Sequence, residues 1–80
     1  MVTTLTVHEF SLGDVDDPEI YAAQPIWEWQ QTEQGRYVME NAVEPPYFNV
    51  VPDMHSYGYR VIIRGKLTPE AETYFRLKYL

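Results

Sequence analysis

The chain has 80 residues with twelve carboxylates, six lysines or arginines and no cysteine, which gives a formal net charge of −6. This length suits a single domain, residues 1–80, and the lack of cysteine excludes a disulfide framework and a thiolate metal site. No apolar run approaches the roughly 20 residues that span a bilayer, and the start lacks the basic region of a secretion signal, so we expect a soluble, cytoplasmic protein with no membrane partner.

The charge is divided along the chain. Residues 1–53 hold ten of the carboxylates and one base, Arg36, for a net charge of −9, whereas residues 54–80 hold five bases and two carboxylates, for a net charge of +3. We therefore expect an acidic face and a basic face on one small body, and the potential of each face decides which partners it attracts.

The first predicted element is a strand from Thr3 to Leu12, a segment rich in β-branched residues that ends before Gly13. Simple alternation places Leu5 and Val7 on one side of this strand. It places four residues on the other side: Thr4, Thr6, His8 and Phe10.

A helical segment follows, with Asp17 as its N-cap and Pro18 at its first position. From Ile20 to Ala42 the composition favours helix, but the apolar positions change sides partway along. We expect a helix that changes course close to Gly35, where glycine acts as a C-cap or permits close packing. Pro45 and Pro46 then end helical structure.

The rest of the chain is predicted to form strands. Tyr47 to Val51 reads as a short edge strand followed by Pro52, and Tyr57 to Leu67 alternates between apolar and cationic residues. Thr73 to Leu80 alternates in the same way, so we expect a hairpin closed by residues 68–72, with Ile63 facing Leu77. The rival is a terminal helix capped by Thr68, which would place Lys78 on its apolar stripe.

The predicted fold is therefore α+β, with the order β-α-α-β-β-β. The broken helix packs on the apolar face of a small antiparallel sheet.

One candidate surface is the outer face of the predicted hairpin, where cations surround an aromatic side chain. Such a face suits single-stranded nucleic acid, because phosphates require cations and unstacked bases require a flat ring. The same bases could instead pair with carboxylates of the acidic first part, which would make them structural. The residues of this nucleic-acid alternative are Arg60, Arg64, Lys66, Tyr74, Arg76 and Lys78.

The other candidate surface lies on the acidic helical segment. Spaced carboxylates can imitate a phosphate backbone, and Trp27 and Trp29 lie two apart, so a helix cannot direct both into one core. We expect Trp27 to be partly exposed and to anchor a protein partner, whereas in the alternative a loop covers it and both rings are buried. The candidate protein-binding residues are Trp27, Glu28, Glu33, Tyr37 and Glu40.

Catalysis has little support in the sequence. The histidines are His8 and His55, and neither belongs to a histidine pair at metal-binding spacing or to a glycine-rich phosphate loop. We therefore expect a non-enzymatic protein with no cofactor and no metal.

Three segments carry a family resemblance: residues 17–23, residues 27–40 and the final run Tyr74 to Tyr79. In these the chain resembles small proteins of unassigned role encoded by tailed bacteriophages. The resemblance implies expression in a bacterial cytoplasm and a role in host takeover, defence evasion or virion assembly. The leading hypothesis is a protein that binds a host or phage protein, with acidic mimicry of nucleic acid as one mode; nucleic-acid binding and a structural homodimer are the alternatives.

Overall fold

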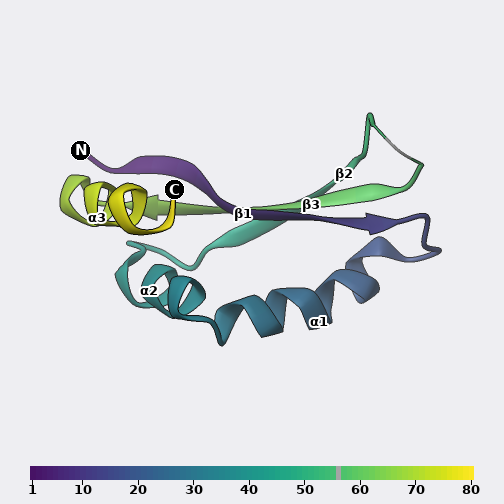
Figure 1. Ribbon diagram of the computed structural model, residues 1–80, viewed down its shortest axis with the longest axis horizontal. Coiled ribbons are helices and arrows are strands. Elements are labelled where there is room, and N and C mark those ends of the chain that lie inside the picture. Colours follow the sequence, from purple (N-terminus) through teal and green to yellow (C-terminus); the bar gives the residue numbers. More distant parts are fainter. Residues whose placement is uncertain (56) are drawn as a thin grey trace.

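The computed structural model describes residues 1–55 and 57–80, and within them it has three strands and three helices. Their order is β1 (Thr3–Gly13), α1 (Pro18–Gln30), α2 (Glu33–Asn41), β2 (Tyr47–Pro52), β3 (Tyr59–Leu67) and α3 (Pro69–Tyr79) (Figure 1). β3 is the central strand and pairs antiparallel with both β1 and β2. The predicted α+β class and the edge position of β2 are confirmed.

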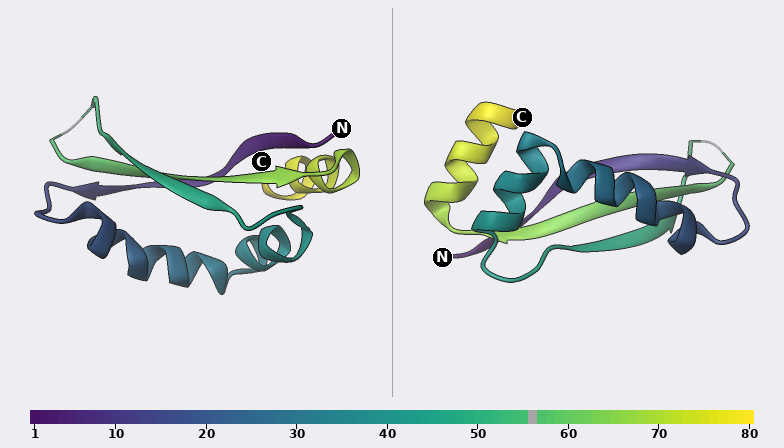
Figure 2. Two further views of the ribbon diagram at one scale, coloured as in Figure 1. Left: turned by 180° about the vertical axis from the view of Figure 1, so that it is seen from behind. Right: turned by 90° about the horizontal axis from the view of Figure 1, so that it is seen from below.

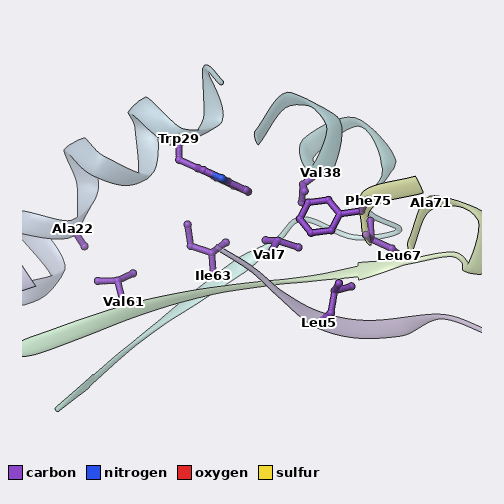
Figure 3. Packing of buried hydrophobic residues seen from close by; sticks show 10 residues of the cluster. All are labelled: Leu5, Val7, Ala22, Trp29, Val38, Val61, Ile63, Leu67, Ala71 and Phe75. Carbon is purple, nitrogen blue, oxygen red and sulfur yellow. The ribbon is translucent and has the colours of Figure 1, made fainter. Parts of the chain in front are cut away.

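Two of the helices, α1 and α2, cover one face of the sheet (Figure 1). α1 and α2 run along that face, and α3 lies beside α2 at the end of the sheet (Figure 2). Between these layers lie the buried apolar side chains, with Trp29, Val38 and Phe75 directed from the three helices toward the strands (Figure 3). On the opposite face, β1 and β2 carry exposed polar or aromatic residues: Thr4, Thr6, Glu9, Ser11, Tyr47 and Asn49.

The predicted break in the helical segment is confirmed, although it lies at residues 31–32 and not at Gly35. Thr32 accepts a hydrogen bond from the Gly35 amide at 3.0 Å and so caps α2, while its own hydroxyl donates to the Trp29 carbonyl at 2.6 Å. Gly35 is a point of close packing, because a Cβ there would lie 1.9 Å from the Trp29 carbonyl oxygen.

β1 departs from simple alternation at a β-bulge between Thr6 and His8. Leu5 and Val7 are buried, as predicted. His8, however, pairs with Ile63, and Phe10 pairs with Val61, both on the face covered by helices. The prediction that placed His8 and Phe10 on the opposite side from Leu5 is therefore wrong, because the bulge inserts one residue and reverses the alternation beyond it.

The predicted C-terminal hairpin is also wrong, and the rival helix is the correct structure. The Thr68 side chain accepts a hydrogen bond from the Ala71 amide at 3.3 Å, Pro69 opens the helix, and Glu70 and Glu72 occupy its first turn. Ala71 and Phe75, four residues apart, are buried together.

Leu77, which the hairpin placed opposite Ile63 in the core, is 83% exposed. The argument against this helix was that it would place Lys78 on the buried apolar stripe. The long side chain of Lys78 instead leaves that stripe and reaches the carboxylate of Glu33 on α2. The helix therefore buries no charge.

Candidate functional site

The outward face of α1 carries exposed apolar side chains. The helix turns Ala22 and Trp29 into the core, and this directs Ile20 and Trp27, which lie seven residues apart, to the opposite side. Ile20 is 70% exposed and Trp27 is 56% exposed, whereas Trp29 is 5% exposed. The expected exposure of Trp27 is confirmed. Ile20 was missed, although its spacing from Trp27 in the sequence indicates the shared face.

Carboxylates without an ion pair surround this face. In the part of the chain that the structure describes, four ion pairs join a base to Glu9, Glu33, Glu44 or Glu72. Among the described residues, five carboxylates that belong to none of these pairs lie on α1 or in the loop before it: Asp14, Asp16, Asp17, Glu19 and Glu28. Most of the carboxylates outside these ion pairs therefore lie on the helix that carries Ile20 and Trp27 or just before it, where they attract a basic partner.

The predicted protein-binding residues divide between two helices. Trp27 and Glu28 are exposed on α1, and Glu40 is exposed on α2. Glu33 is held by Lys78 and Tyr79. The hydrogen bond between Glu33 and Lys78 is the main cause that lowers the pKa of the Glu33 carboxyl group and raises the pKa of Lys78.

Tyr37, the remaining member of that set, belongs to the contact between α2 and α3. Its ring stacks on Tyr74 with centroids 4.8 Å apart, and its hydroxyl donates to the Ala71 carbonyl at 3.2 Å. Glu33 and Tyr37 therefore join the two helices, although the Glu33 side chain remains exposed. The exposed members of the predicted set that lie outside this contact are Trp27, Glu28 and Glu40.

The predicted basic face does not form one surface, because the hairpin does not exist. Arg60, Arg64 and Lys66 lie on the open face of β3, whereas the other three residues, Tyr74, Arg76 and Lys78, lie on α3. Four of the five bases are paired: Arg60 with Glu9 and Lys66 with Glu44, both at 2.9 Å, Arg76 with Glu72 at 2.8 Å, and Lys78 with Glu33. Three of these carboxylates belong to the acidic first part of the chain. This agrees with the alternative in which the bases pair with that part and have a structural role.

A groove between β1 and α1 is the second notable surface. It has a volume of about 550 Å³ and is lined by residues that include His8, Phe10, Pro25, Glu28 and Trp29. The His8 ring stacks on Trp29, with centroids 5.6 Å apart and planes 12° apart, and Phe10 lies 5.9 Å from His8. The Trp29 indole Nε1 donates to Gln34 at 2.9 Å, which fixes the ring. The sequence did not indicate this groove, since it depends on the bulge in β1.

The pKa of His8 provides a test of this packing. Burial lowers the pKa of His8 below its ordinary value of 6.5, and the Glu9 carboxylate opposes this shift. Protonation therefore favours the unfolded chain, and the free energy of unfolding falls as the pH is lowered through about 6.5. An NMR titration should give a pKa for His8 below that of the same residue in the urea-unfolded chain, and His8→Gln should reduce the acid sensitivity. A higher pKa in the folded chain would contradict the stacking of His8 on Trp29.

The described residues contain neither a candidate metal-binding cluster nor a membrane-spanning helix. No group of three or more histidine, aspartate or glutamate side chains there is placed to hold a metal ion. No helix there is long and apolar enough to cross a membrane.

Comparisons with protein-family models, with curated proteins and with solved structures found no match to this chain.

Proposed function

We propose that this chain is a non-enzymatic interaction protein that binds a basic surface of another protein through the outward face of α1. The observation that carries the proposal is the exposure of Ile20 and Trp27 among carboxylates that form no ion pair with another described residue. Tryptophan is enriched among the residues that dominate binding energy, and burying its ring removes a large apolar area from water.

The charges and the apolar side chains have separate roles in this proposal. Carboxylates attract a basic partner over a distance and mainly raise the association rate, whereas a buried aromatic anchor mainly slows dissociation. Asp14, Asp16, Asp17, Glu19 and Glu28 supply the first effect, and mimicry of a phosphate backbone by these carboxylates is one form of it. The resemblance to small phage proteins makes host and phage proteins the first partners to test.

The experiment is capture of partners from a bacterial lysate, followed by kinetics with the partner recovered. Trp27→Ala should raise the dissociation rate about 30-fold or more, as expected for a hot spot of about 2 kcal/mol. Glu19→Gln with Glu28→Gln should lower the association rate several-fold, with a smaller loss at high salt. Leu77→Ala is the matched control, because Leu77 is an exposed apolar residue on α3. Equal kinetics for Trp27→Ala and Leu77→Ala would reject the proposed surface.

A second candidate function is binding of single-stranded nucleic acid by the open face of the sheet. Arg64 favours it, because among the described residues it forms no ion pair and its cross-strand partner on β2 is Tyr47, which is 44% exposed. We expect no binding of a generic oligonucleotide at physiological salt, since paired carboxylates neutralise Arg60 and Lys66 and the whole molecule is acidic. A salt-sensitive complex that weakens on Arg64→Gln would promote this candidate.

A further inference from the structure

The groove beside β1 continues along the free edge of that strand. A second cavity of about 460 Å³ shares His8 and Gln34 with the first and is also lined by Thr6, Val7 and Glu9. Together the two cavities are lined by every residue of β1 from Thr6 to Ser11. Open space therefore follows β1 over these six residues.

β1 also has unpaired backbone on this side. It is an edge strand, and its one strand partner in the described part of the chain is β3. Alternate backbone N–H and C=O groups of an edge strand point away from its neighbour and are available to a further strand. The other edge of the sheet is less suitable, because β2 is shorter and ends at Pro52, which has no amide hydrogen.

The bulge gives this edge a binding pocket. Beyond Thr6 it turns His8 and Phe10 toward α1, where Trp29 and Pro25 complete an apolar wall. A strand added to β1 would direct alternate side chains to the helix-covered face, where one of them would meet this wall. Backbone pairing then provides affinity, and the pocket provides specificity.

The charges around the groove indicate which occupant the edge of β1 attracts. Glu28 lies at the groove and forms no ion pair with another described residue, and the acidic loop at residues 14–17 follows the end of β1. A second copy of this chain would bring a further net charge of −6 and the same carboxylates to the contact. A basic segment is attracted where a second copy is repelled.

We infer that the free edge of β1 binds an extended peptide as a fourth strand, with an apolar side chain against Phe10, Pro25 and Trp29 and a lysine or arginine beside Glu28. This site is separate from the outward face of α1, since Trp27 and Trp29 point to opposite sides of that helix. Either surface can bind its partner in the absence of the other.

The probe is a blocked heptapeptide in which lysine alternates with leucine or valine, added to the full chain and followed by NMR. We expect saturable binding, with the largest shifts at the amides of residues 6–11 and at the Trp29 indole. The matched control peptide carries N-methyl groups on alternate amides, which keeps its charge and apolar content but prevents strand pairing. It should bind at least tenfold more weakly.

Variants of the chain test the charge contact. Glu28→Gln should weaken binding about three- to tenfold, whereas Leu77→Ala on α3 should leave it unchanged. Equal affinity for the N-methylated peptide, shifts outside residues 6–11, or no binding at millimolar peptide would each overturn the inference. Sedimentation that shows a dimer, with protection of the β1 amides from exchange, would also overturn it and identify a second copy as the occupant.

Discussion

Phe75→Ala should lower the free energy of unfolding by about 3–5 kcal/mol, because it removes a ring that is fully buried among Val38, Leu67 and the strands beneath them. A domain of this size has a total stability of roughly 4–12 kcal/mol, so the variant should be largely unfolded in modest urea. Urea denaturation followed by circular dichroism measures the loss.

Leu77→Ala is the matched control for this change. Leu77 is two residues away on the same helix and 83% exposed, so its truncation should alter the stability by no more than about 0.5 kcal/mol. In the hairpin that the alternation predicted, Leu77 would lie in the core together with Phe75. A larger loss for Leu77→Ala than for Phe75→Ala would therefore reject α3 as described.

Gly35→Ala should cost about 3 kcal/mol or more, although alanine is the better helix former. The added methyl group would lie 1.9 Å from the Trp29 carbonyl oxygen and 2.7 Å from its carbonyl carbon, so the ends of α1 and α2 must separate. Arg36→Ala is the control, because Arg36 is the next residue of α2 and is exposed. Equal stability of the two variants in urea would show that the helices do not approach as closely as described.

The parts of the fold that follow one periodicity could be predicted from the sequence. Val61, Ile63 and Leu67 alternate with Arg60, Arg64 and Lys66 in β3, and the structure buries the first set and leaves the second on the open face. The helical break and the exposure of Trp27 were also predictable, since both depend on spacing along one helix.

Two features were predicted wrongly, and each has a physical cause. The segment after Thr68 alternates as a strand would, but the capping interaction of Thr68 and the charges suited to the helix dipole favour a helix. The side chain of Lys78 escapes burial through its own length. Tertiary contacts and caps therefore outweighed the local pattern.

The bulge in β1 is the other feature, and it determines the groove. No residue type in Thr6, Val7 and His8 requires an extra residue in the strand, and the bulge is defined by how β1 aligns with β3. The exposed stripe on α1 was accessible to sequence reasoning, whereas the aromatic wall of the groove required the three-dimensional pairing.

The binding surface is tested most directly by an amide chemical-shift map of the labelled chain with the partner recovered from the lysate. If the outward face of α1 binds that partner, the largest changes fall at Glu19 to Glu28, including the Trp27 indole, and the open face of β3 is unaffected. Changes confined to Arg60, Arg64 and Lys66, with α1 unchanged, would contradict the proposal.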